Sequence, residues 1–111
     1  TVLVWLDGGG RVDATFTREG LNGFTLLMVA ALYGHERLAV ALLQRGASIH
    51  LRNSEGLTAL MLAALRVHER LAATLLQRGA SVHLQNSDGF TALLFAAFKD
   101  HERVAELLLQ H

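Results

Sequence analysis

The sequence predicts an all-α fold, in which similar helix–turn–helix units stack side by side as an α-solenoid. The segments 23–55 and 56–88 align without a gap and are identical at 23 of 33 positions, where chance pairing gives about two. Residues 89–111 continue the same register, with 13 identities to the preceding copy. Within each copy the apolar residues recur at helical spacing. A repeat of this length indicates units that bury their apolar faces only against one another.

The same register defines the expected domain organisation. Residues 1–111 form a single repeat domain in this prediction, with two complete repeats at 23–55 and 56–88. A partial repeat with a loop extension precedes them at 1–22, and a second partial repeat follows at 89–111. Because both ends fall partway through a repeat, we expect the chain to be a fragment of a longer array.

The N-terminal part contains two features outside the repeat. Gly8-Gly9-Gly10 could suggest a phosphate-binding loop, but the Lys-Ser/Thr that completes such a loop is missing, and a helix end with a turn explains the glycines better. The segment 15–22 is expected to form a longer loop between repeats. Long loops often carry recognition, and an insertion without a function explains this segment equally well.

Each complete repeat contains the signals of two helices. In the first one, Thr25 can cap a helix at about residues 26–33, since its hydroxyl precedes an apolar run. A second helix is expected at about 36–44. It ends before Gly46, because glycine best tolerates the left-handed conformation that follows a helix. The stretch 48–55 is then an extended loop that leads to the next unit.

These residues resemble the ankyrin repeat. The family pattern, roughly G-x-T-P-L-H-x-A-A-x-x-G-H followed by L-L-x-x-G-A, appears here as Gly23-Phe24-Thr25-Leu26-Leu27-Met28-Val29-Ala30-Ala31-Leu32-Tyr33-Gly34-His35 and Leu42-Leu43-Gln44-Arg45-Gly46-Ala47. The resemblance covers nearly the whole chain. It implies antiparallel helix pairs, β-hairpin-like loops set at an angle to them, and a concave surface of loop tips and first helices that binds other proteins.

The sequence departs from the family pattern at the turns. The Pro and His of the family's Thr-Pro-Leu-His tetrad are replaced by Leu26 and Met28 in the first complete repeat. The turn glycine is kept as Gly34, but its equivalents are Val67 and Asp100. A positive φ would strain a valine by about 1–2 kcal/mol, and we therefore expect the second repeat to adjust its turn.

Composition excludes several functional classes. Lys+Arg and Asp+Glu number ten each, so the chain lacks the basic excess typical of nucleic-acid binding. The chain has no Cys, which excludes disulfides and thiolate metal sites. No segment reaches the roughly 18 apolar residues of a spanning helix, so no membrane insertion is expected. An intracellular, cytoplasmic location is the default expectation.

The motif His-Glu-Arg opens each expected second helix, at His35, His68 and His101. A zinc-protease helix needs a second His four residues after the first, and alanine occupies those positions. We therefore expect the motif to begin the second helix and to pack against the turn that precedes it. No carboxylate pair, Ser/His/Asp arrangement or Cys nucleophile can be proposed from the spacing, so we expect no catalytic residue, no metal and no cofactor.

His50 and His83 occupy a loop position where the family usually has Asn, and Asp13 holds the same place in the N-terminal remnant. Asn, Asp and His are the non-glycine residues that best tolerate left-handed backbone. Loop geometry therefore explains these residues without a ligand. A metal site or a pH switch is the alternative.

The expected binding face follows from the resemblance. In the family, the residue after the loop glycine and the two residues after the paired alanines are exposed on the concave side. Large apolar patches on soluble proteins mark interaction sites, and aromatic residues and Arg are typical anchors. The expected contact residues are Phe24, Leu32, Tyr33, Leu57, Leu65, Arg66, Phe90, Phe98 and Lys99. The loop tips would form a polar rim of Arg52, Asn53, Ser54, Glu55, Gln85, Asn86, Ser87 and Asp88.

The function implied by the resemblance is a non-catalytic protein–protein interaction scaffold that holds another protein or peptide on its concave face. Two alternatives stay open at this point. The repeats could be a regulatory or spacer segment of a larger enzyme or channel, or a structural fragment whose apolar face is covered by missing repeats. The chain is expected to be a monomer unless the apolar face self-associates.

Overall fold

The computed structural model describes residues 11–18 and 21–111. These residues form two strands and six helices. In chain order they are β1 (Thr15–Arg18), β2 (Leu21–Thr25), α2 (Leu26–Tyr33), α3 (Glu36–Gln44), α4 (Ala59–Leu65), α5 (Glu69–Gln77), α6 (Ala92–Phe98) and α7 (Glu102–Leu109). Gly8-Gly9-Gly10, considered above as a phosphate loop, lies outside the described residues.

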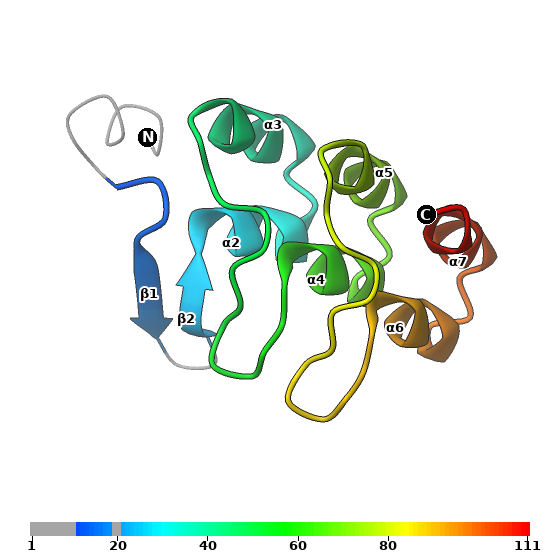
Figure 1. Cartoon of the computed structure of the whole chain (residues 1–111). Helices are drawn as coiled ribbons and strands as arrows, with labels where there is room; N and C mark the ends of the chain where they lie inside the picture. Colours follow the sequence, from blue (N-terminus) through cyan, green and yellow to red (C-terminus); the bar gives the residue numbers. More distant parts are fainter. Residues whose placement is uncertain (1–10, 19–20) are drawn as a thin grey trace.

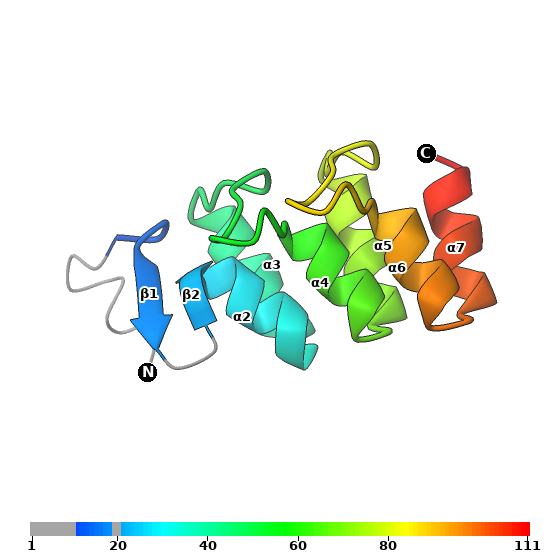
Figure 2. The ribbon, with the colours of Figure 1, turned by 90° about the horizontal axis from the view of Figure 1, so that it is seen from below.

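The helices stack in two layers (Figures 1 and 2). The first helices of the units, α2, α4 and α6, lie side by side in one layer, and α3, α5 and α7 lie in the other. The loops that join one unit to the next project from the same side of the stack (Figure 1). This arrangement confirms the predicted all-α solenoid of helix–turn–helix repeats.

Threonine caps start the first helices as the sequence predicts. The Oγ1 of Thr25 accepts a hydrogen bond from the N–H of Met28, at 3.2 Å. Thr58 and Thr91 make the same bond in α4 and α6, each at 3.3 Å. Such a cap satisfies one of the N–H groups that the first turn of a helix leaves free. In α2 the Sδ of Met28 also accepts from the Thr25 N–H at 3.4 Å, at the position where the family has His.

The turns between paired helices keep a left-handed residue in all three units. Gly34 has φ of 74°, and its equivalents Val67 and Asp100 have φ of 63° and 52°. The expectation that the second unit adjusts its turn is therefore wrong. The N–H of His68 bonds to the carbonyl of Ala63 at 2.9 Å, and the matching groups bond in the same way in the other two units. Because this backbone bond and the packing of the helices fix the turn, Val67 accepts the strained conformation.

The core lies between the two helix layers. Ala31 and Ala64 have no exposed surface, so their small side chains let α2, α4 and α6 approach one another closely. Leu42 and Leu75 extend from the second layer and are also completely buried. Each buried leucine contributes about 1.5–3 kcal/mol to folding, so the stack is stabilised mainly by contacts within and between units.

The segment before the first complete unit is a hairpin, where a loop was expected. β1 pairs antiparallel with β2, with Thr15 opposite Thr25 and Phe16 opposite Phe24, and a bulge follows Phe16. The hairpin lies at the end of the stack beside α2 (Figure 1). Threonine and phenylalanine favour extended backbone, and this preference is the local signal that the repeat comparison overlooked. Upstream of β1, the Oδ1 of Asp13 accepts from the N–H of Ser48 at 2.9 Å.

Candidate functional site

Several residues expected on the binding face lie in the core. Phe24, Leu32 and Leu57 are buried, so the expectation that they are exposed is wrong. Each lies in a unit that has another unit beside it, and the neighbouring side chains cover it. Large apolar residues can replace the family's usual residues there because adjacent units bury them.

Two further expected contact residues are partly buried. Leu65 and Phe90 both pack against the core. The ring of Phe90 meets those of Phe95 and Phe98 edge to face, with centroids 5.9 and 5.5 Å apart. Edge-to-face pairs of this kind stabilise their surroundings, so the main contacts of Phe90 are within its own unit.

Four of the expected contact residues are exposed. Phe98 is 65% exposed, and Tyr33, Arg66 and Lys99 are exposed as well. Tyr33, Arg66 and Lys99 occupy the same position in successive units, at the C-terminal ends of α2, α4 and α6. We call these three residues the first-helix row. The row presents one aromatic side chain and two positive charges, where the sequence predicted a mainly apolar face.

The loop tips are shaped by two asparagines. The Oδ1 of Asn53 accepts from the N–H groups of Glu55 and Leu57, each at 2.9 Å. Asn86 makes the equivalent bonds in the next loop, at 3.0 and 2.8 Å. Asn53 is buried, so its predicted place in an exposed rim is wrong: a side chain that holds its own turn points inward. The exposed part of the rim is Arg52, Ser54, Glu55, Gln85, Ser87 and Asp88.

The loops are hydrogen-bonded to one another along the stack. The N–H of Ser54 donates to the carbonyl of Asn22 at 3.2 Å, and its hydroxyl donates to the same oxygen at 2.9 Å. One unit further on, the N–H of Ser87 donates to the carbonyl of Glu55 at 3.0 Å. A Cβ on Gly56 would lie 2.8 Å from the Ser87 nitrogen, so this close approach requires glycine. The loop tips therefore form one connected edge.

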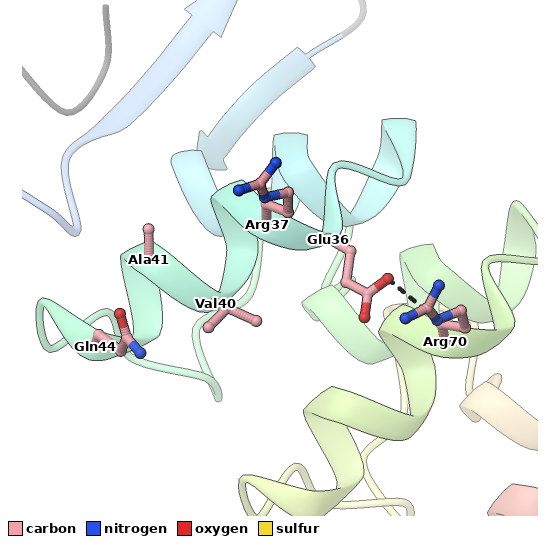
Figure 3. A pocket seen from close by; sticks show the side chains of 6 residues that line it. All are labelled: Glu36, Arg37, Val40, Ala41, Gln44 and Arg70. Atoms are coloured by element: carbon pink, nitrogen blue, oxygen red, sulfur yellow. Dashed lines mark ion pairs between the residues drawn. The ribbon is translucent and has the colours of Figure 1, made fainter.

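The His-Glu-Arg motifs make contacts between units. Glu36 in α3 pairs with Arg70 in α5 at 3.5 Å (Figure 3), and Glu69 pairs with Arg103 in α7 at 3.4 Å. The Nε2 of His68 donates to the carbonyl of Leu32 in the preceding unit, at 3.1 Å. These contacts give the motif the structural role that its spacing suggests. The described ranges contain no group of three His, Cys, Asp or Glu that could hold a metal ion.

His50 and His83 do not adopt left-handed backbone, so the prediction that loop geometry of this kind selects them is wrong. In the part of the chain that the structure describes, Val67 and Asp100 are the only non-glycine residues with positive φ. His50 and His83 are exposed loop residues with ordinary backbone. An exposed position in a loop accepts a polar side chain of this size without special geometry.

Figure 3 shows a groove of about 470 Å³ on the surface of the second helices. It lies between α3 and α5 and is lined by Glu36, Arg37, Val40, Ala41, Gln44 and Arg70. The Glu36–Arg70 pair crosses one end of it, and the Arg70 side chain is almost fully exposed. The groove is therefore the space between two adjacent second helices, and no motif in the sequence indicates a site there.

The comparisons with known proteins place the chain in a family. The family model described as ankyrin repeats (three copies) matches residues 2–86 and again residues 27–111. A search of curated proteins finds no match to the chain. Among the described residues, no helix is long and apolar enough to cross a membrane. Because the two matches extend over almost all of the sequence and the helix pairs follow the repeat register, the chain belongs to the ankyrin repeat family.

Proposed function

We propose that this chain is a non-catalytic scaffold that binds a partner protein on the surface formed by the first-helix row and the exposed loop tips. Ankyrin repeats generally mediate protein–protein interaction, and ankyrin domains are typically non-enzymatic. The observation that carries the proposal is the exposure of Tyr33, Arg66 and Lys99 at one position of three successive first helices.

The chemistry of the row suits recognition. Tyrosine and arginine are enriched at the centres of protein interfaces, since each offers apolar area together with hydrogen-bond donors. Arg66 and Lys99 have no ion-pair partner within the described ranges, so both charges are available to a partner. We expect the partner to carry acidic groups opposite them.

The connected loop edge supports the same proposal. Hydrogen bonds join the loops of adjacent units at Ser54 and Ser87. A preorganised surface loses less conformational entropy on binding than a set of independent loops. Phe24 and Leu57 are buried below this surface, and their packing holds the backbone of the loops and first helices in place.

The experiment compares two double variants of the whole chain in affinity capture with quantitative mass spectrometry. Arg66→Ala/Lys99→Ala removes the charges of the row. Arg37→Ala/Arg78→Ala removes two exposed arginines of the second layer and serves as the control. We expect the first variant to lose the proteins that the wild type captures and the control to keep them. Equal capture by the two variants would contradict the proposed face.

A further inference from the structure

Asn22 and Gly23 lie where the hairpin meets the first loop tip. Asn22 in β2 pairs with Thr17, and the next pair joins Phe24 to Phe16. Gly23 is therefore the extra residue of the bulge, and such a residue is left out of the regular ladder. Gly23 has φ of 74°, and Asn22 is exposed. An exposed side-chain amide thus precedes a peptide nitrogen whose own residue has no side chain.

These two residues contain the groups that an intramolecular deamidation needs. When the Gly23 nitrogen attacks Cγ of Asn22, a nitrogen–carbon bond forms and the bond from Cγ to Nδ2 breaks. The proton of the Gly23 nitrogen leaves with the amide group as ammonia, and a five-membered succinimide remains. Glycine favours this ring closure, because no Cβ hinders the nitrogen and the backbone adopts many conformations. Water then opens the succinimide at one of its two carbonyl carbons.

Ser54 makes this pair more reactive than its sequence alone would. The N–H of Ser54 donates to the main-chain carbonyl oxygen of Asn22 at 3.2 Å, and its hydroxyl donates to the same oxygen at 2.9 Å. That carbonyl and the Gly23 nitrogen belong to one peptide group. Both donors therefore stabilise the negative charge that this group acquires when the nitrogen loses its proton and attacks. The same donors polarise the main-chain carbonyl of the succinimide, which directs water to that carbon.

We propose that Asn22 and Gly23 form a site of spontaneous deamidation, promoted by the two donors of Ser54, with water as the co-reactant. The exposure of this position does not depend on where the sequence begins or ends. Its equivalent Glu55, at the junction of two complete units, is also exposed. Asn22 lies on the connected loop edge, but the reaction needs no partner, so this proposal does not rest on the proposed binding function.

The other two asparagines of the chain, Asn53 and Asn86, are held against the same reaction. Each is followed by a serine, and the N–H groups of Ser54 and Ser87 donate to carbonyls of the preceding unit at 3.2 and 3.0 Å. These bonds must break before either nitrogen can attack. The Oδ1 of each asparagine also accepts two backbone bonds, which hold the amide in its own turn. The folded structure therefore selects Asn22.

The two products of the reaction differ in their effect on the loop edge. Opening at Cγ gives aspartate, which adds a negative charge and keeps the main chain as it is. The equivalent residues Glu55 and Asp88 already have a carboxylate there, so the fold accepts this product. Opening at the main-chain carbonyl gives isoaspartate, whose main chain runs through Cγ and is longer by one methylene. The oxygen that accepts from Ser54 then leaves the main chain, and the hairpin is released from the first loop.

The test incubates the whole folded chain in mildly alkaline buffer and follows each asparagine by peptide mapping and mass spectrometry with electron-transfer dissociation. Asn22 should convert, with isoaspartate in excess over aspartate. Asn53 and Asn86 should react more slowly by about tenfold or more, since neither precedes glycine. Asn22→Glu, which copies Glu55, is the matched control and should remain unmodified. Ser54→Ala should slow the reaction at Asn22, and circular dichroism should show that this variant with an exposed substitution folds.

Hydrogen exchange measures the structural consequence. The amide of Ser54 should lose protection in the isoaspartate form, separated by ion exchange, and keep it in freshly purified Asn22→Asp. The proposal is overturned if Asn22 stays intact, if Asn53 or Asn86 reacts as fast, or if Ser54→Ala reacts at the rate of the wild type or faster. Formation of aspartate without isoaspartate would also overturn it, because direct attack of water on the side chain gives that result.

Discussion

The Nε2 of His68 lies 3.1 Å from the carbonyl oxygen of Leu32, so a side chain of one unit is hydrogen-bonded to the backbone of the unit before it. Because a carbonyl only accepts, the histidine nitrogen must carry the hydrogen. The imidazole ring also covers Gly34, at the turn between α2 and α3. One histidine therefore connects two adjacent units at the turns between their paired helices.

This contact predicts that a side chain in place of Gly34 destabilises the protein. A Cβ at this position would lie 2.6 Å from the ring of His68, and the backbone has φ of 74°. We expect Gly34→Ala to lower the free energy of unfolding by about 2 kcal/mol or more, from strain and displacement of the ring. Chemical denaturation measures the loss. Gly46→Ala is the control, since φ there is 89° but no atom lies within 4 Å, and an equal loss in both variants would contradict the role of His68.

The left-handed backbone conformation of Val67 predicts that glycine at this position stabilises the protein. Val67 has φ of 63°, and its β-branched side chain is strained in this region. Val67→Gly should raise the free energy of unfolding by about 1 kcal/mol, because the strain released exceeds the loss of a partly buried side chain. Thermal and urea unfolding measure the change. Ala73→Gly, within α5, should instead lower it by about 1 kcal/mol, and a loss at Val67 would refute the assignment of strain.

The buried Asn53 holds the turn of the first loop, so removing its side chain should lower the free energy of unfolding. Asn53→Ala removes the acceptor for the N–H groups of Glu55 and Leu57. We expect a loss of about 1–3 kcal/mol in the free energy of unfolding, since the Leu57 N–H stays buried without its partner. Asn86→Ala, in the more exposed second loop, should cost less. Equilibrium denaturation compares the two variants, and the reverse order would argue against burial as the cause.

The ion pairs between second helices should contribute little to stability. Arg70 and Glu36 are 3.5 Å apart, but the Arg70 side chain is 86% exposed. A double-mutant cycle with Arg70→Ala and Glu36→Ala should give a coupling energy of about 0.2–0.5 kcal/mol that disappears in 1 M salt. A coupling that survives high salt would show that the pair is desolvated.

The sequence predicts the helices well because their signals are local. The threonine caps, the apolar spacing and the period of 33 residues depend only on neighbours along the chain. The hairpin β1–β2 was not predicted because its residues include extra positions outside the 33-residue register and were expected to form a loop. Thr15 and Phe16 already favoured extended backbone, so a test of that segment by itself would have indicated a strand.

Exposure was harder to predict than helix position because it depends on the next unit. Phe24 and Leu57 occupy positions that the family leaves to recognition, yet adjacent units cover them here. Leu94 and Met61 are equivalent in the sequence and opposite in exposure. The sequence thus predicted the elements on which these residues lie, while the division between exposed residues and core required the structure.

The loop-to-loop hydrogen bonds have a consequence for how such a gene can change. The N–H groups of Ser54 and Ser87 donate to the carbonyls of Asn22 and Glu55, and every residue except proline can supply such a donor. An in-frame deletion of residues 56–88 would remove Ser87 and its bond to Glu55. It would bring Arg103 into the place of Arg70, opposite Glu36. Because the loop bonds and the Glu–Arg pairs recur at both junctions, recombination in steps of 33 residues preserves these contacts, while the bond between His68 and Leu32 belongs to one junction.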